Sequence, residues 1–439
     1  MSSVVHVFPT RYNLHMRSRT VVVLILTISA LAQNSPKPAA QPEAEPKSVT
    51  VPITLSHNRV IIDVSLPLPD GTTQRVHAWV DSGNPDLYLS RRLFERTGGS
   101  RSCDGQVCST TPPLEMSIGG MTITLGGRIP GSGIKEAKVS AGGAPIAPGL
   151  DADINIPSTV LRNYDVLINF PDHELTIAQP GSLKFKGVTA KVMVNARNGV
   201  IQVPSQIENK KYNLGLDLGS SISFLAEDLF DKLSAAHPDW PHMTGAVGPA
   251  NMRGLPEELK WKLMRVDRVQ YGPLYLTGVP FVDFPEEAMT FFKMRVGVPT
   301  AGLLGANALM NYRVGLDYAH STVYFDIGRT FNFPDFDVIG LILRPEDDGR
   351  FTILGIADFD GKPSVDGVQA GDHLVAVDSI PVSGSSMGQV WSMLGGEPGK
   401  ERTLTVERAG KQFTVVAKVQ HFLGETADKD EGKRKTKKR

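Results

Sequence analysis

Short apolar, strand-like runs recur along the chain and are the main feature of its hydrophobic pattern. Two such runs, residues 60–66 and 199–204, each begin a long β-rich stretch. Short helical patterns follow within these stretches, at residues 91–96 and 227–233. Glycine and proline are dense between residues 119 and 148, which is typical of hairpins and loops. The pattern therefore predicts a mainly β fold with short helices.

The two β-rich stretches contain an internal repeat. Residues 79–94 align without gaps with residues 215–230, and the alignment places Asp81 on Asp217. Each aspartate follows an apolar, strand-like segment and begins an Asp-x-Gly tripeptide. A single tripeptide of this kind is weak evidence, because a turn in which the aspartate caps its own backbone gives the same pattern.

A second pair of matching segments lies downstream in the same order. Residues 163–170 align with residues 311–318, and a short β-rich run follows each of them, at residues 175–177 and 322–325. Two matches in one order and at similar separation indicate a duplicated unit. The duplication gives each aspartate a partner at the same position of a related half.

Two aspartates placed in this way have a clear chemical use. Carboxylates about 3 Å apart cannot both ionise cheaply, so they share one proton. The ionised member takes a proton from a water, the protonated member donates to a carbonyl oxygen, and the water adds to the carbonyl carbon. A glycine after each aspartate, Gly83 and Gly219, lets backbone approach the carboxylates closely. We therefore predict that Asp81 and Asp217 form a catalytic pair.

Residues 51–332 resemble the aspartic protease superfamily, in the retropepsin-like form fused into a two-lobed, pepsin-like arrangement. Residues 79–83 match the motif of two hydrophobic residues followed by Asp-[Ser/Thr]-Gly, residues 214–220 match it less well, and residues 301–312 resemble the later hydrophobic-hydrophobic-Gly element. The resemblance implies two β-barrel lobes and an aspartic-type endopeptidase that acts on peptides or proteins without a cofactor or metal. The catalytic-loop support residues that it implies are Ser82, Gly83, Gly219, Ser220 and Gly305.

Three positions depart from the family pattern. Leu218 replaces the serine or threonine whose hydroxyl helps to tie the two loops together, whereas Ser82 keeps its hydroxyl. Asn84 stands where the first lobe usually carries Ser, Thr or Ala, and Pro157 aligns with Gly305. Two hypotheses stay open: an active endopeptidase, and a peptide-binding protein that keeps the protease fold with weak or no turnover.

From about residue 335 the pattern changes. Residues 340–343 and 351–355 are apolar β segments, and residues 367–374 resemble the Gly-Leu-x-x-Gly-Asp-x-Ile signature of bacterial PDZ domains. The resemblance covers residues 335–421 and implies a PDZ-like β-sandwich that binds an extended peptide or a C-terminus at a sheet edge. The candidate loop for a terminal carboxylate consists of Gly340, Leu341, Ile342 and Leu343. A third hypothesis is that this domain gates the cleft in cis.

Two further motifs allow more than one interpretation. Residues 384–388 fit the Gly-x-Ser-x-Gly nucleophile pattern, but Ser386 with Gln389 also forms a helix capping box, which we favour. Residues 116–125 are a candidate hairpin that either covers the cleft of the first lobe or is an ordinary surface hairpin.

The N-terminus resembles an export signal. Arg17 and Arg19 precede an apolar run at residues 21–32 that ends in a small-residue cleavage pattern. The run is too short to span a bilayer comfortably, so we expect a periplasmic or secreted protein with no stable membrane span after cleavage. An uncleaved anchor and a start at Met16 are alternatives. The expected segments are a signal peptide (1–32), a linker (33–49), an N-lobe (50–186), a C-lobe (187–332), a PDZ-like domain (335–421) and a charged tail (422–439).

Cysteine and charge content narrow the expected partners. The two cysteines, Cys103 and Cys108, are expected to form a disulfide in an oxidising compartment, and two thiols alone make a poor metal site. The 46 basic and 46 acidic residues give a formal net charge of zero, so composition provides no reason to expect nucleic acid as a partner.

Overall fold

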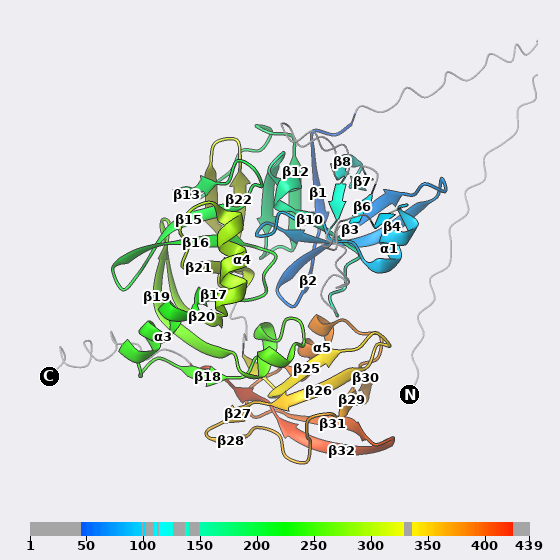
Figure 1. Ribbon diagram of the computed structural model, residues 1–439, viewed down its shortest axis with the longest axis vertical. Helices are drawn as coiled ribbons and strands as arrows, with labels where there is room; N and C mark the ends of the chain where they lie inside the picture. The colour runs from blue at the N-terminus through cyan, green and yellow to red at the C-terminus, as the bar shows by residue number, and fades with distance from the viewer. Residues whose placement is uncertain are drawn as a thin grey trace, which may run out of the picture. The chain divides into compact units, whose positions relative to one another are not determined.

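The computed structural model describes residues 45–98, 100–101, 109–111, 114–125, 137–139, 149–328 and 336–424. They form a mainly β structure, as predicted (Figure 1). The expected signal peptide, most of the linker, Cys103 and Cys108, and most of the charged tail lie outside the described residues. Within the described ranges, no helix is long and apolar enough to cross a membrane.

The N-lobe, defined here as strands β1 to β12, contains a sheet in the order β10-β4-β3-β7-β8, with β2 paired to β3. Its strands bury valine, isoleucine and leucine side chains on the inner face. Its elements are β1 (Ser48–Pro52), β2 (Thr54–Ser56), β3 (Arg59–Pro67), β4 (Thr73–Asp81), α1 (Arg91–Arg96), β5 (Ser100–Arg101), β6 (Ser109–Thr111), β7 (Leu114–Ile118), β8 (Met121–Leu125), β9 (Ala137–Val139), β10 (Ile154–Pro157), α2 (Ser158–Leu161), β11 (Asp165–Asn169) and β12 (Glu174–Ala178).

The candidate hairpin at residues 116–125 is formed by β7 and β8. The apolar side chains of both strands are buried, and the turn residue Gly119 lies against Val49 and Val51 of β1. The structure therefore gives this hairpin a packing role in the N-lobe.

The C-lobe, strands β13 to β23, contains an eight-stranded sheet in the order β14-β15-β16-β21-β17-β20-β19-β18. Helix α3 covers the segment predicted to be helical, whereas α4 was not predicted. Helix α4 begins after Pro285 and ends before Gly297, whose left-handed φ of 73° suits a helix C-terminus. The elements are β13 (Val188–Lys191), β14 (Met193–Val194), β15 (Ile201–Ile207), β16 (Lys210–Asp217), β17 (Ser223–Ala226), α3 (Glu227–Ala236), β18 (His242–Thr244), η1 (Gly248–Ala250), η2 (Pro256–Leu259), β19 (Lys262–Tyr271), β20 (Leu274–Phe284), α4 (Glu286–Val296), β21 (Gly302–Gly305), η3 (Ala306–Ala308), β22 (Tyr312–Asp317) and β23 (Thr322–Ile327).

A third sheet joins the lobes and shows their two-fold relationship. Its order is β1-β12-β11-β22-β23-β13, so equivalent strands occupy mirrored places. The central strands β11 and β22 are the second matching pair of the sequence repeat. They are antiparallel, with Leu167 opposite Gly315. These two residues also align with each other in the repeat, which is the register that a two-fold axis through the pair requires.

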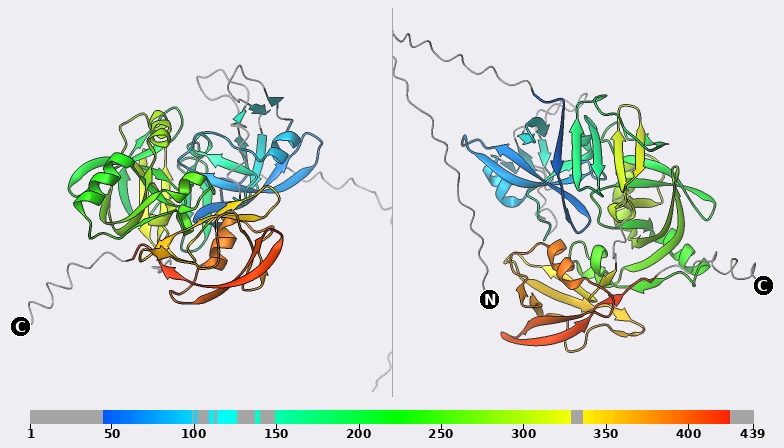
Figure 2. Two further views of the ribbon diagram at one scale, coloured as in Figure 1. Left: turned by 60° about the horizontal axis from the view of Figure 1, so that its bottom comes forward. Right: turned by 180° about the vertical axis from the view of Figure 1, so that it is seen from behind.

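The C-terminal domain, strands β24 to β33, contains a six-stranded antiparallel sheet in the order β25-β26-β29-β31-β32, with β30 paired to β29, and one helix; it is drawn in yellow to red (Figure 2). Ser386 caps this helix through the predicted capping box with Gln389, so its serine is a helix cap and not a nucleophile. The elements are β24 (Asp337–Val338), β25 (Leu341–Pro345), β26 (Phe351–Ile356), β27 (Asp358–Phe359), β28 (Lys362–Pro363), β29 (His373–Val377), β30 (Ile380–Pro381), α5 (Met387–Leu394), β31 (Glu401–Arg408), β32 (Lys411–Lys418) and β33 (Gln420–His421).

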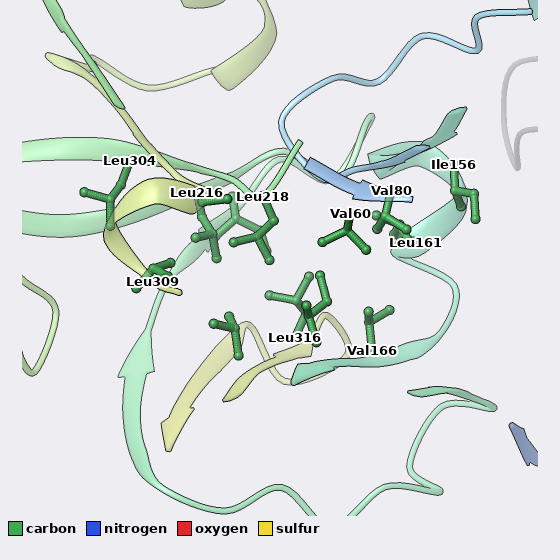
Figure 3. Packing of buried hydrophobic residues seen from close by; sticks show 14 of the residues in the cluster. Val60, Val80, Ile156, Leu161, Val166, Leu216, Leu218, Leu304, Leu309 and Leu316 are labelled. Atoms are coloured by element: carbon green, nitrogen blue, oxygen red, sulfur yellow. The ribbon is translucent and has the colours of Figure 1, made fainter. Parts of the chain in front are cut away.

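Buried apolar residues form two clusters. The first spans both lobes, and Val60, Val80, Leu216 and Leu316 meet within it (Figure 3). The second joins side chains of the C-lobe, such as Phe224, to side chains of the C-terminal domain. The C-terminal domain therefore shares a hydrophobic core with the C-lobe.

Candidate active site

The two aspartates end equivalent strands of the two lobes. Asp81 is the last residue of β4, and Asp217 is the last residue of β16. Strand β10 runs parallel to β4 with Pro157 opposite Asp81, and β21 runs parallel to β16 with Gly305 opposite Asp217. The sequence alignment of Pro157 with Gly305 thus corresponds to equivalent positions in space.

The glycine of each loop lies against the aspartate of the other loop. A side chain at Gly83 would overlap the carboxylate of Asp217, and a side chain at Gly219 would collide with the carboxylate of Asp81. Only glycine permits this approach, because it has no Cβ. The two Asp-x-Gly loops therefore face each other across the lobe boundary, with both carboxylates in the contact.

One hydroxyl ties the loops together. The Ser82 hydroxyl donates a hydrogen bond to the carbonyl oxygen of Leu216 at 3.2 Å and accepts one from the Leu218 N–H at 2.9 Å. Leu218 cannot return the contact, and its side chain lies in the hydrophobic cluster beside Leu216 (Figure 3). Within the C-lobe, Ser220 supports its own loop by donating to the carbonyl of Ile222 at 2.7 Å. The tie between the loops is thus one-sided.

Gly305, another of the predicted support residues, lies directly behind the C-lobe loop. Its N–H donates to the Ser223 hydroxyl at 2.9 Å, and a side chain at Gly305 would collide with the Ile222 carbonyl. Glycine is required there because the strand passes directly behind the C-lobe loop.

The two carboxyl groups have different surroundings. Asp81 is 1% exposed, and burial followed by the charge of Asp217 raises the pKa of Asp81 well above its ordinary range. Burial also raises the pKa of Asp217, to about 6, although backbone N–H groups including that of Gly219 at 2.9 Å lower it. Donors to a carboxylate favour its ionised form. The two carboxyl groups are therefore placed to share one proton, and the fixed backbone donors favour the ionised form of Asp217.

Arg59 is a buried cation beside the pair that sequence reasoning missed. It begins β3, is 5% exposed, and its guanidinium lies 5.8 Å from the ring centroid of Trp79. Its Nε has no hydrogen-bond partner among the described residues. Burial lowers the pKa of Arg59 to about 10, so it is charged at neutral pH, and its charge lowers the pKa of both Asp81 and Asp217.

The strand register explains why Arg59 lies there. In the β3–β4 pair, Ile61 is opposite Trp79, so extending the register by two residues brings Arg59 opposite Asp81. The same extension in the C-lobe brings the buried Val200 opposite Asp217. The sequence feature that could have identified Arg59 is its position as a charged residue at the start of an otherwise apolar strand.

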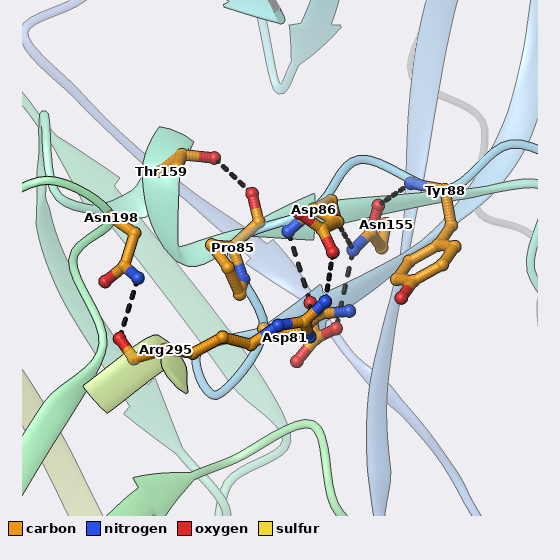
Figure 4. A network of polar contacts seen from close by, with 9 residues as sticks. Asp81, Pro85, Asp86, Tyr88, Asn155, Thr159, Asn198 and Arg295 are labelled. Carbon is orange, nitrogen blue, oxygen red and sulfur yellow. Dashed lines mark hydrogen bonds and ion pairs between the residues drawn. The ribbon is translucent and has the colours of Figure 1, made fainter. Parts of the chain in front are cut away.

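Arg295 connects the last turn of α4 to the loop after Asp81. It donates to the Asn84 side-chain oxygen at 2.9 Å and forms an ion pair with Asp86 (Figure 4). The Asn84 side chain in turn hydrogen-bonds Asp81. Sequence reasoning missed Arg295 because it did not predict α4.

Asn155 lies on β10 beneath the same loop. Its amide nitrogen donates to the Asp86 carbonyl at 2.9 Å and lies 3.4 Å from the Asp81 carboxylate, and its oxygen accepts from the Tyr88 N–H at 2.6 Å (Figure 4). In the repeat it aligns with Leu303, so a polar residue at an apolar repeat position was the signal for it.

The side chains of the candidate carboxylate loop in the C-terminal domain are buried, and its role in binding a terminal carboxylate stays a prediction. Leu341, Ile342 and Leu343 are at most 1% exposed, and Gly340 lies against Ser364 and Phe422. The backbone of Leu343 is hydrogen-bonded to a side chain of the C-lobe, Asn251.

No group of three or more potential metal ligands occurs within the part of the chain that the structure describes.

Comparisons with known proteins add little to this geometry. No protein-family model matches the chain. None of the curated proteins matches it by sequence. Among solved structures it is similar to an aspartic proteinase from Irpex lacteus, with a TM-score of 0.36, 12% identity, and coverage of 64% of this chain and 97% of that chain. A similarity this low carries no argument, so the interpretation of the site depends on its own residues.

Proposed function

We propose that this chain is an aspartic-type endopeptidase in which Asp81 and Asp217 activate a water for hydrolysis of a peptide bond. The observation that carries the proposal is the reciprocal contact of the two loops, with Gly83 against Asp217 and Gly219 against Asp81. The raised pKa values of both carboxyl groups agree with a shared proton.

The different hydrogen-bond donors around Asp81 and Asp217 support the following roles in the first step. Ionised Asp217 takes a proton from a water held between the carboxyl groups, and the water oxygen bonds to the scissile carbonyl carbon. Asp81 gives its proton to the carbonyl oxygen, which leaves a neutral tetrahedral intermediate. Collapse of the intermediate breaks the C–N bond. The proton taken by Asp217 passes to the amine that leaves, and one hydroxyl of the intermediate returns a proton to Asp81 as the C=O bond re-forms, which restores the pair.

The other parts of the proposal concern substrate and location. The substrate is a peptide or protein, the C-terminal domain is PDZ-like and binds an extended peptide or a C-terminus, and the chain is exported to the periplasm or secreted. These parts rest on the sequence resemblances.

A second candidate is a peptide-binding protein with weak or no turnover. Two observations favour it: the one-sided tie at Leu218, and the buried charge of Arg59 beside the pair. Both alter the surroundings of the carboxyl groups without removing either of them.

One experiment separates the two candidates. The mature chain is incubated with a mixed peptide library from acidic to neutral pH, beside Asp81→Asn and Asp217→Asn, with Asp151→Asn as a surface control. The endopeptidase is supported if cleavage is lost in both aspartate variants and kept in the Asp151→Asn control. Peptide binding without cleavage at any pH refutes it and supports the second candidate.

A further inference from the structure

The edge strand of the C-terminal sheet is occupied by a segment of the C-lobe. Strand β25 pairs with β26 on one side, and among the described residues no strand of its sheet lies on the other. On that free side, the Leu343 N–H donates to the Asn251 side-chain oxygen at 2.8 Å, and the Asn251 amide nitrogen donates to the Leu343 carbonyl at 3.0 Å. One side-chain amide thus makes the two hydrogen bonds that the backbone of an added strand would make.

A buried carboxylate holds Asn251 in this orientation. Glu258 and Asn251 are both fully buried. Glu258 accepts hydrogen bonds from the Asn251 amide, from the Arg253 N–H at 2.8 Å and from the Gly254 N–H at 3.2 Å. Both Glu258 oxygens accept from backbone N–H groups, so the end of the Asn251 amide that faces Glu258 is the NH₂ donor. We call residues 245–259 the masking segment.

Further contacts extend the mask along β25. A side chain at Gly254 would collide with the backbone of Arg344, and one at Gly245 would meet the Ile342 side chain at 3.0 Å. Leu259 lies against Gly355 of β26. The masking segment therefore follows the strand over several residues.

The helix beside β25 is covered as well. Gly388 of α5 lies against the backbone of His57, at the turn between β2 and β3 of the N-lobe. The His57 ring stacks with Trp391 at 6.5 Å and hydrogen-bonds the Gly248 carbonyl of the masking segment at 2.6 Å. Both elements that would line a peptide groove are thus in contact with the chain's own lobes.

We infer that the masking segment is an intramolecular ligand of the C-terminal domain, and that an extended peptide binds along β25 only by displacing Asn251. The inference rests on the PDZ-like part of the proposed function. It adds that the domain is closed in the resting chain, and that the affinity for peptide is reduced by the fraction of molecules in which the mask is open.

A peptide-binding experiment on a chain whose catalytic pair has been inactivated tests the inference. The probe is a pool of short fluorescein-labelled peptides with free C-terminal carboxylates, and the parent chain carries Asp81→Asn so that no peptide is cut. Asn251→Ala removes both hydrogen bonds to Leu343, so we expect it to bind the pool about ten- to a hundredfold more tightly than the parent. Asn213→Ala, which loses a side-chain bond elsewhere in the C-lobe, serves as the control and should match the parent. Equal affinity of Asn251→Ala and the parent, or no binding by Asn251→Ala, overturns the inference.

A second variant decides the matter if Asn251→Ala does not fold. A Cβ at Gly254 would lie 2.5 Å from the Arg344 Cα, so we expect Gly254→Ala to push the masking segment away from β25 and to bind the peptide pool more tightly than the parent. Gly71→Ala is the control, because Gly71 also has a left-handed φ and a methyl group there would meet nothing within 4 Å. Equal affinity of Gly254→Ala and the control overturns the inference. Because the dyad is silenced throughout, the result is independent of whether the proposed endopeptidase activity exists.

Discussion

The two aspartate loops come from copies of one unit, yet the surroundings of their carboxyl groups differ. Asp217 accepts hydrogen bonds from backbone N–H groups, including that of Gly219, whereas Asp81 meets the side-chain amides of Asn84 and Asn155. Backbone donors are fixed and favour the ionised form. The comparison teaches that duplication supplies a symmetric frame, and that unequal neighbours then give the two carboxyl groups different hydrogen-bond donors.

The two aspartate loops differ in two further ways. Ser82 of the first loop bonds the second loop, whereas the equivalent Leu218 packs in the core. Arg59 lies opposite Asp81, whereas an apolar residue occupies the equivalent place opposite Asp217. Each difference can be tested by substitution.

Removal of either carboxylate is expected to have the largest effect. Asp81→Asn and Asp217→Asn should each lower kcat/KM for peptide cleavage by at least about 10³-fold, because one removes the acid and the other the base. Steady-state cleavage assays measure this, with Asp151→Asn as the control. Activity within about tenfold of the parent in either variant would contradict the assignment of the pair.

Closing the space between the loops should come next. Gly219→Ala places a methyl group against Asp81 and should lower kcat about 10²-fold, because small displacements of catalytic groups are costly. The control is Gly424→Ala, where a methyl group would meet nothing closer than 3.8 Å. Unchanged kcat in Gly219→Ala would mean that the loops are not held at this separation.

Loss of the Ser82 hydrogen bonds between the loops should have a moderate effect. Ser82→Ala leaves the Leu218 N–H and the Leu216 carbonyl without their partner, so we expect the free energy of unfolding to fall by about 1–3 kcal/mol. Urea denaturation of a dyad-silenced chain measures this, and Ser117→Ala in β7 is the control. A stability equal to that of the parent would show that the tie contributes nothing.

The Arg295 contact should matter less, because Asp86 is partly exposed and such ion pairs contribute little. Arg295→Met should lower kcat about two- to fivefold with little change in the unfolding transition. Arg295→Lys restores the charge without the planar guanidinium, and we expect it to recover only part of the loss. Full recovery would indicate that charge alone is required.

Substitution of Arg59 should change activity least at the optimal pH, and its effect should instead appear in how activity depends on pH. The Arg59 charge lowers the pKa of Asp217, which is about 6, so Arg59→Met should raise that pKa and move the acidic limb of the kcat/KM profile to higher pH. Arg59→Lys should move it back. An unshifted limb in Arg59→Met would show that Arg59 does not act on the pair.

The same pKa values predict how stability depends on pH. Because folding raises the pKa of Asp217 from 3.8 to about 6, its contribution to stability is present below about pH 4 and is lost as the pH rises through 6. The melting temperature of Asp217→Asn should therefore fall less than that of the parent between pH 4 and 7. An identical fall in both chains would contradict the raised pKa.

The sequence predicted much of the frame because the frame repeats. The helices at residues 91–96 and 227–233 and the capping box of Ser386 with Gln389 follow local patterns, and gapless alignment of residues 79–94 with 215–230 pairs the two aspartates. It also identified the departures at Leu218 and Pro157. These features are local or repeat along the chain, so they can be recognised from one sequence.

Tertiary structure alone decided what surrounds the pair and what covers the C-terminal domain. Arg295 and Asn84 are 211 residues apart, and Asn251 and Leu343 are 92 residues apart. No local pattern links such positions, because packing of the lobes and of the C-terminal domain brings them together. The sequence by itself therefore determined that two aspartates belong together, whereas the tertiary structure decided which hydrogen-bond donors and charges surround each of them and that Asn251 lies on β25.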